Sequence, residues 1–279
     1  MEQAVPAEAT IRLAVFLGIF GAMALLELVS PRLERDELHG AWKSRRWFAN
    51  VALVVLSSLI LRVAFPAAAV GAAMWAGQPG WGLLRILHVP PVLAGILAFI
   101  VLDLAVWAEH VASHKIPLFW RFHRVHHVDT AIDVTTGLRF HPVEILLSMV
   151  WKAGVVVALG APPMAVLVFE IVLNAGAMFS HSNIRLFGRL DRLLRQVIVT
   201  PDMHRVHHSS TPEETDSNYG FNFAFWDRLF GTYIDQPQAG HDAMRIGLNA
   251  PRGAETMRIG WLLGFPFRRG LRQKKLTGK

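Results

Sequence analysis

The sequence has no cysteine among its 279 residues. This absence excludes disulfide bonds, iron–sulfur clusters, thiolate-ligated haem and cysteine nucleophiles. Charged residues are also scarce, at 18% of the chain against roughly 25% in ordinary soluble domains. Any bound metal must therefore be held by histidine, carboxylate or backbone groups, and little charge is available to cover a water-exposed surface.

Signatures of nucleic-acid binding and of a removable leader are missing as well. The net charge of +7 comes from 28 basic and 21 acidic residues, but no RNP-like or zinc-finger pattern accompanies it, so we expect no nucleic-acid partner. Glu2 and Glu8 precede the first apolar stretch and no basic run does, which argues against a cleavable signal peptide. The basic charge suits topology signals and an anionic membrane surface.

Hydrophobic residues make up 53% of the chain and gather in long runs. Because a bilayer core is crossed by about 20 residues of helix, such runs predict membrane spans. Pro162 and Pro163 divide the longest run, so its halves should form a tight hairpin; alternatively, one half is buried without spanning. The predicted membrane segments are 11–29, 48–65, 92–108, 143–160 and 164–181.

The expected fold is all-α. Residues 1–279 form one membrane domain with about four transmembrane helices, the last pair being the proline-split hairpin, and residues 109–142 and 182–279 form a cytoplasmic helical cap. The loop 32–46 and the tail 268–279 are basic, so the positive-inside rule places both in the cytoplasm together with the histidine motifs. We expect an integral protein of a bacterial inner membrane.

Most of the 13 histidines lie in short motifs. His110 and His114 are four residues apart, so on a helix they share a face and can chelate one ion. The pattern His-Arg-Val-His-His occurs at 123–127 and again at 204–208, and its adjacent histidines point in different directions, so each copy can reach two ions. The candidate ligands are His110, His114, His123, His126, His127, His181, His204, His207 and His208.

Nine imidazoles exceed the four ligands of a zinc site, so we expect two ions. Asp103 shares the helix face of His110 and is predicted to hydrogen-bond a ligand imidazole. His141 is either a tenth ligand or the residue that begins the hairpin helix. The histidines without partners at ligand spacing are expected in loops or at the interface: His39, His88 and His241.

These motifs resemble those of the fatty acid hydroxylase / sterol desaturase superfamily of membrane di-metal oxygenases. The resemblance covers roughly residues 95 to 270 and implies membrane helices under a cytoplasmic cap, with the nine histidines as ligands of two irons. The matching stretches, in the family's order, are DLAVWAEHVASH (103–114), RFHRVHH (121–127), RFHPVE (139–144), HSN (181–183), DMHRVHH (202–208), NYG (218–220) and WDRLFGTY (226–233).

The resemblance also implies O₂-dependent hydroxylation or desaturation of a C–H bond in a lipid-type substrate such as a fatty acid, a sterol or hopanoid, or a carotenoid. The sequence departs from the family at Val111, where arginine is common, and at Ala177, where some members have a further histidine. The ligand set around His181 therefore stays open, and His141, Asn183 or a water are candidates to complete it.

The ligand chemistry agrees with a redox metal. Imidazole suits iron and zinc alike, so zinc can occupy the site in isolated protein, but only a redox-active metal activates O₂ as co-substrate. The chain has no cysteine cluster, no GxGxxG and no His-Pro-Gly-Gly motif, so the electrons must come from a separate donor protein. The basic surface either docks that donor or serves topology and anionic-lipid attraction alone.

Two rival functions follow from the same residues. A dizinc membrane hydrolase or isomerase would also use a histidine-rich site, although Glu109 precedes His110 and no HExxH motif is present. A non-enzymatic metal-binding protein, such as a transporter or store, predicts polar residues along the spans. The few that are found are Arg62, Asp103, Lys152, Glu170 and Asn174. Of these, Glu170 and Asn174, one turn apart, either line a lipid path or make a helix–helix contact.

Overall fold

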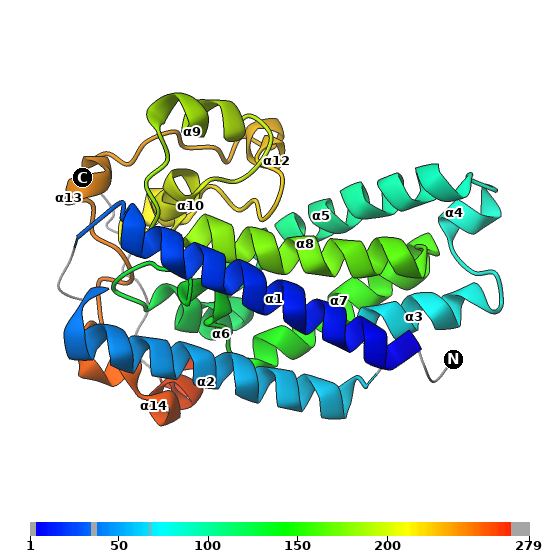
Figure 1. Cartoon of the computed structure of the whole chain (residues 1–279), viewed down its shortest axis with the longest axis horizontal. Coiled ribbons are helices and arrows are strands. Elements are labelled where there is room, and N and C mark those ends of the chain that lie inside the picture. The colour runs from blue at the N-terminus through cyan, green and yellow to red at the C-terminus, as the bar shows by residue number, and fades with distance from the viewer. Residues whose placement is uncertain (1–3, 35–37, 67, 269–279) are drawn as a thin grey trace.

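The computed structural model describes residues 4–34, 38–66 and 68–268, and these are helical apart from turns, loops and isolated β-bridges. Long helices run side by side along the long axis of the molecule, and short helices gather at one end (Figure 1). The long helices are α1 (Ala4–Val29), α2 (Gly40–Ala64), α5 (Pro91–Lys115), α7 (Pro142–Leu159) and α8 (Pro163–His181).

The short elements form the cap, except α3 and α4, which lie toward the opposite end of the bundle (Figure 1). They are α3 (Ala68–Gly77), α4 (Leu83–Ile86), α6 (Pro117–His127), η2 (Thr136–Leu138), α9 (Gly188–Leu194), α10 (Pro201–His207), α11 (Pro212–Thr215), α12 (Phe225–Leu229), α13 (Gly240–Ala243), η3 (Ala254–Met257), α14 (Ile259–Gly264) and η4 (Phe265–Phe267).

Within the described residues, five stretches are long and apolar enough to cross a membrane, which confirms the predicted all-α membrane fold. Both halves of the proline-split hairpin are among them. The stretches are Thr10–Val29, Gly40–Gly77, Pro91–Lys115, Pro142–Leu159 and Pro163–His181.

One helix end differs from the prediction, because α2 begins at Gly40 rather than at residue 48. Helix α5 continues past the predicted span to Lys115, so His110 and His114 lie on a helix, as predicted. Hydropathy marks where a helix leaves the apolar layer, not where it ends. In α2 the additional turns carry Arg46, which is buried against the cap, so tertiary contacts extend the helix beyond its apolar run.

Prolines set the start of several helices. At the first turn, proline removes only an N–H that would have no helical partner, and its fixed φ suits the helix. Gly160 ends α7 with a left-handed φ of 67°, two residues before Pro162, so the hairpin turn is tight. The helices with proline in their first turn include α5, α6, α7, α8 and α10.

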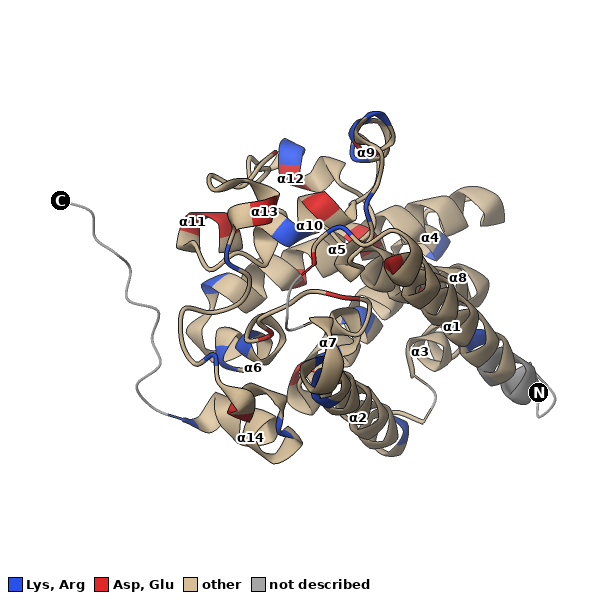
Figure 2. Cartoon of the chain, turned by 60° about the vertical axis from the view of Figure 1, so that its left-hand side comes forward, with Lys and Arg blue, Asp and Glu red and all other residues tan. Residues whose placement is uncertain are grey.

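The spans have the apolar outer surface that is expected of a membrane bundle. Large apolar side chains such as Leu17, Leu59 and Val63 are exposed on α1 and α2, while the buried Ala69 and Ala73 of α3 allow close packing against α7 and α8. Charged residues are concentrated on the cap and sparse along the spans (Figure 2).

Ionic contacts of Glu170 join the spans internally, and the partners are Arg12 of α1 and, at 4.0 Å, Lys152 of α7. Glu170 of α8 accepts a hydrogen bond from the Arg12 guanidinium of α1 at 2.6 Å, and the Asn174 amide donates to the Glu170 carbonyl at 2.8 Å. A paired charge is the form in which ionisable groups are tolerated inside a bilayer. Glu170 therefore makes the helix–helix contact that was one of the two predictions from the sequence, whereas the Asn174 amide is bonded within α8.

A buried charge network attaches the cap to α2. The Arg46 guanidinium donates to Asp129 at 2.7 Å and to Asp133 at 2.9 Å. Arg139, fully buried, donates to the Asn50 side chain and to the backbone carbonyl of Val125. These contacts join α2 to the loop that follows α6. They therefore fix the position of α6 relative to α2.

Candidate metal centre

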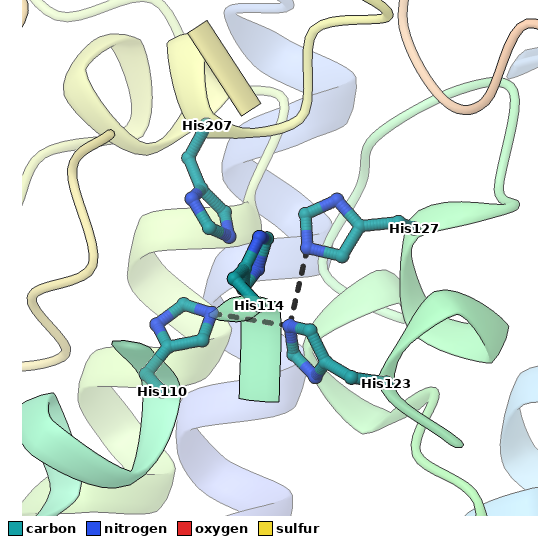
Figure 3. Close-up of side chains that lie close together, drawn as sticks. All are labelled: His110, His114, His123, His127 and His207. Atoms are coloured by element: carbon teal, nitrogen blue, oxygen red, sulfur yellow. Dashed lines mark hydrogen bonds between the residues drawn. The ribbon is translucent and has the colours of Figure 1, made fainter. Parts of the chain in front are cut away.

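All nine predicted ligand residues converge in the cap in two groups. Within each group, one ring nitrogen per histidine lies within 4.8 Å of every other. The five-histidine cluster is His110, His114, His123, His127 and His207 (Figure 3), and the four-histidine cluster is His126, His181, His204 and His208. They come from the ends of α5 and α8, from α6, and from α10 and the residue that follows it.

The repeated motif serves both clusters. His126 and His127 are adjacent on α6 but belong to different clusters, and the adjacent His207 and His208 divide in the same way. Neighbouring residues of a helix point about 100° apart, so each motif supplies both groups. This is the arrangement that the spacing predicted, although the role of these residues as metal ligands remains a proposal.

The cap histidines are neutral. They are buried, and burial lowers the pKa of His123 to about 3. Burial first, and then the neighbouring imidazoles, lowers the pKa well below the ordinary value for His126, His127, His204, His207 and His208. Neutral imidazole is the form that donates an electron pair to a metal.

Backbone carbonyls fix the tautomer of several rings. A carbonyl oxygen can only accept, so a ring nitrogen that contacts it carries the proton, and the other nitrogen keeps its lone pair. His110 Nδ1 donates to the Tyr219 carbonyl at 2.7 Å, and His181 Nδ1 donates to the Ala177 carbonyl at 2.6 Å. His126 and His207 make the same contact, with the carbonyls of Arg139 (3.2 Å) and Ser217 (2.7 Å).

Two of the remaining nitrogens face one another without a proton between them. His126 Nε2 and His181 Nε2 are 3.1 Å apart, and both are acceptors because their Nδ1 protons are used elsewhere. Among the described residues, His207 Nε2 and both ring nitrogens of His208 are buried without a hydrogen-bond partner. Facing lone pairs repel unless a cation lies between them, so the donor set fits two imidazole-ligated metal ions.

Glu144 supports this centre, and the reasoning from the sequence did not assign it a role. Its Oε1 accepts a hydrogen bond from His123 Nδ1 at 2.6 Å, which directs His123 Nε2 toward His110 Nε2 at 3.2 Å. A carboxylate behind a ligand imidazole fixes its orientation and raises its basicity. The available signal was the acidic residue in the stretch RFHPVE, three positions after His141.

The Tyr219 turn, residues 217–220, is a second support. It supplies carbonyls to two histidines, as described above, and Asp227 holds it in place. The Asp227 carboxylate accepts from the backbone N–H groups of Tyr219 and Gly220 at 2.8 Å each, and from Trp107 Nε1 at 3.1 Å. Asn218 in this turn has a φ of 49°, in the left-handed region that asparagine tolerates.

The prediction that Asp103 hydrogen-bonds a ligand imidazole is wrong. Its carboxylate accepts from Asn222 at 2.8 Å, Trp226 at 2.9 Å and the backbone N–H of Phe223 at 3.2 Å. Seven residues correspond to about 10 Å along a helix, so sharing a face with His110 does not bring the two groups into contact. Asp103 instead attaches the segment after the Tyr219 turn to α5.

Neither additional ligand candidate points into a cluster. His141 precedes α7, where its Nδ1 accepts from the Val143 N–H at 3.2 Å and its Nε2 lies 3.3 Å from the Leu263 carbonyl. It is therefore the residue that begins the helix. The Asn183 side chain exchanges two hydrogen bonds with the Leu33 backbone, so it joins the ends of α8 and α1.

The three isolated histidines differ in their exposure to solvent. His39 and His88 are exposed, as expected for loop or interfacial residues. His241 is only 6% exposed and lies in α13 beneath the cap surface. The expectation for His241 was therefore wrong, because lack of a partner at ligand spacing carries no information about burial.

A bundle of membrane-length helices capped by two histidine clusters defines a class of histidine-rich membrane proteins. The family model described as "Fatty acid hydroxylase" matches residues 95–232, which include all nine histidines. The matched stretch is just under half of the chain, and over that stretch the chain is similar to this family.

Curated relatives carry related names. Ornithine lipid hydroxylase OlsE of Rhizobium tropici is 29% identical over 150 residues, 53% of this chain and 44% of the relative. Alkylglycerol monooxygenase of Xenopus tropicalis is 28% identical over 229 residues, which are 78% of this chain and 47% of the relative. Cholesterol 25-hydroxylase of Rattus norvegicus is 28% identical over 177 residues, 59% and 55%. The chain thus spans about half the length of these relatives, and no solved structure matches it.

Proposed function

We propose that this chain is an O₂-dependent lipid oxidoreductase in which the nine histidines hold two iron ions. The reaction would hydroxylate or desaturate a C–H bond of a fatty acid, sterol, hopanoid, carotenoid or related lipid. The observation that carries the proposal is the pair of buried clusters whose neutral imidazole lone pairs face one another. Iron, when bound, supplies the one-electron redox chemistry that O₂ activation needs and that zinc lacks.

The protein's own groups hold and enclose such a centre. Each of α6 and α10 contributes to both clusters, so both helices constrain the separation of the two ions. Backbone carbonyls and Glu144 fix the ring orientations. Burial of the clusters keeps bulk water from the reacting bond and limits side reactions.

The position of the clusters suits a lipid substrate. His110, His114 and His181 lie at the ends of α5 and α8, where the spans leave the apolar layer. A lipid can therefore approach the centre while its chain stays in the bilayer. We propose that this end faces the cytoplasm, where a separate donor protein supplies the two electrons for each O₂.

Comparative lipidomics of cells supplied with ¹⁸O₂ tests the reaction. Cells producing the wild-type chain should accumulate a lipid with one added ¹⁸O atom, or one that lacks two hydrogens. His204→Ala should abolish that product, and the matched control His39→Ala, which removes an exposed imidazole, should retain it. Unchanged lipids without O₂ consumption would reject the oxygenase.

The same preparations separate the rival functions. A dizinc hydrolase or isomerase would be active with zinc alone and would consume no O₂. A metal transporter would move ions across proteoliposomes without O₂ use. Iron content that follows O₂ consumption across preparations supports the proposed oxygenase against both.

A further inference from the structure

A cavity separate from the histidine clusters lies in the cap, and none of its lining residues is one of the nine histidines. Its volume is about 440 Å³, within the roughly 300–1,000 Å³ typical of small-molecule sites. The walls come from the loop after α1, from α9 and its flanks, from α10 and from α13. The polar side chains of the lining include Arg32, Arg192, Arg195, Asp202, Asp235 and His241.

Buried polar atoms along this cavity have no partner. Neither ring nitrogen of His241 has a hydrogen-bond partner within the described part of the chain, and its Nε2 is 3.8 Å from the Asp202 carboxylate. Arg195 Nε and Asp191 Oδ1 are likewise unpartnered, although the other Arg195 nitrogens pair with Asp191 and Asp235. Unmet donors and acceptors beside a cavity indicate a polar ligand.

The cavity lies near the membrane surface. Arg32 is three residues beyond Val29, the last residue of α1, and Leu186 is five residues beyond the end of α8. An antiparallel bridge between Pro31 and Ile184 holds these two exits together. Three residues reach at most about 10 Å, and each headgroup layer is roughly 5–8 Å thick, so the wall of the cavity begins at headgroup depth.

The outer side of α9 has the composition of a membrane-surface helix. Phe187 is 83% exposed and Leu193 is 64% exposed, and Arg185 and Arg189 are exposed beside them. Exposed apolar residues flanked by arginines fit the boundary between lipid headgroups and acyl chains. Figure 2 shows α9 standing apart from the other cap helices, at the margin of the cap.

The charges of the cavity identify the kind of ligand. Arg32, Arg192 and Arg195 are balanced by three aspartates, so the walls have no net charge while the histidine is neutral. Such a lining disfavours a strongly anionic ligand and suits a molecule that carries both signs. Arg192 is exposed at the rim, and within the described residues it has no ionic partner.

We infer that this cavity binds the zwitterionic headgroup of a membrane lipid. The acidic group of the headgroup faces Arg192 and Arg195, its ammonium group faces Asp202 and Asp235, and its acyl chains leave past Phe187 into the bilayer. The inference concerns binding alone, so its failure would leave the proposed oxidation untouched.

Binding of dioctanoyl phosphatidylethanolamine to the detergent-purified full chain, measured by native mass spectrometry, tests the inference. One charge-assisted hydrogen bond is worth about 1.5–3 kcal/mol, so Arg192→Gln should weaken binding about tenfold or more. His241→Phe, which fills the cavity, should abolish it, with thermal unfolding as the check that the variant folds. Arg189→Gln, on the same helix but outside the cavity, should bind like the wild type.

Two comparison probes give the contrary outcomes. Dioctanoyl phosphatidylglycerol, which has the same chains but an anionic headgroup, should bind about tenfold more weakly, since it has no ammonium group to contact the aspartates. Inorganic phosphate should not displace the lipid. Equal binding of both lipids in all variants would overturn the inference, as would full displacement by phosphate, which would indicate a soluble-anion site.

Discussion

At the scale of single residues, the orientation of several imidazoles is set by oxygen atoms that accept hydrogen bonds from their outward ring nitrogens. The ring nitrogens that face inward are acceptors because the outward nitrogens donate to oxygen atoms, such as the carbonyls of Tyr219 and Ala177 and the carboxylate of Glu144. These oxygens come from segments far apart in the sequence. The histidines are thus arranged for metal binding by groups that are not themselves ligands.

Glu144 gives the sharpest test of that support. Glu144→Ala removes the acceptor for His123 Nδ1, so metal affinity should fall about 10- to 100-fold, as is usual for groups behind a ligand. Glu144→Gln keeps an oxygen acceptor and should recover part of the loss. Competition with a chelator, followed by metal analysis, measures this.

The matched control for Glu144 is Glu109→Gln, because the Glu109 carboxylate is hydrogen-bonded to Ser148 at 3.1 Å. It should retain metal like the wild type. If both glutamate variants lost metal equally, the effect would be general to buried carboxylates, and the role of Glu144 in orienting His123 would be wrong.

His241 should make stability depend on pH. Burial lowers its pKa to about 4, while the nearby Asp202 acts in the opposite direction; an unfolded histidine titrates near about 6.5. Between these values the unfolded chain binds more protons, so the contribution of neutral His241 is complete above pH 6.5 and is lost as the pH falls toward 4. His241→Gln should flatten this part of the stability profile.

Thermal unfolding of wild type and variants from pH 7.5 to pH 4.5 checks this dependence. His39→Gln, which removes an exposed imidazole, is the control and should leave the wild-type slope unchanged. A slope that His241→Gln does not alter would show that other groups dominate acid sensitivity.

Much of the site could be predicted at this scale, and some of it could not. The adjacent His126 and His127 were predicted to reach different ions, and they belong to different clusters. The spacing left open which of them joins His123. The partners of Asp103 and the supporting role of Glu144 depend on how loops far apart in the chain fold back. No local pattern encodes such distant contacts, and Asp103 was therefore misplaced.

At the scale of elements, the centre depends on close backbone contacts between the cap and the spans. Gly137 of η2 packs against α8: a Cβ there would lie 2.8 Å from the Ala177 carbonyl and 3.4 Å from His181 Nδ1. That carbonyl is the acceptor that orients His181. The contact between η2 and α8 is therefore part of the geometry of the four-histidine cluster.

Gly137→Ala should disturb both fold and site. Overpacking of this kind costs about 1–3 kcal/mol, and displacement of the Ala177 carbonyl should lower metal retention at the four-histidine cluster. Thermal unfolding and metal content measure the two effects.

Gly154→Ala is the control, because nothing lies within 4 Å of a Cβ at that position of α7. Alanine there should be neutral or stabilise the helix by up to about 1 kcal/mol. If Gly137→Ala behaved like Gly154→Ala, the close contact between η2 and α8 would not be important.

Helix positions were largely predictable because proline and glycine mark them, as at Gly160 and Pro163. The start of α2 was not, since its first turns are polar and are stabilised by the Arg46 contacts with Asp129 and Asp133. Apolar runs indicate which part of a helix lies in the bilayer, whereas contacts with the cap determine how far the helix extends beyond it.

At the scale of the whole molecule, the chain is an apolar bundle with a polar cap at one end (Figures 1 and 2). From the similarity to the fatty acid hydroxylase family and the position of the cap, we propose that both electron supply and lipid access occur at that face. The orientation of the cap toward the cytoplasm is a proposal based on the basic residues near Arg46.

Cysteine labelling can test this orientation directly, because the chain has no cysteine of its own. Gln78→Cys lies exposed at the end opposite the cap, and Ser44→Cys lies exposed at the cap end. In intact cells an impermeant maleimide should label the cysteine at 78 but not the one at 44, which should react only after lysis. The reverse pattern would place the cap outside.

The central claim is that the two histidine clusters hold two metal ions, and iron stoichiometry tests it most directly. Protein produced with iron and purified without added metal should contain about two irons per chain with a nitrogen-rich shell, as read by elemental analysis and X-ray absorption. His114→Ala and His204→Ala, one from each cluster, should each lose iron. One ion per chain, or iron content that neither variant changes, would contradict the claim.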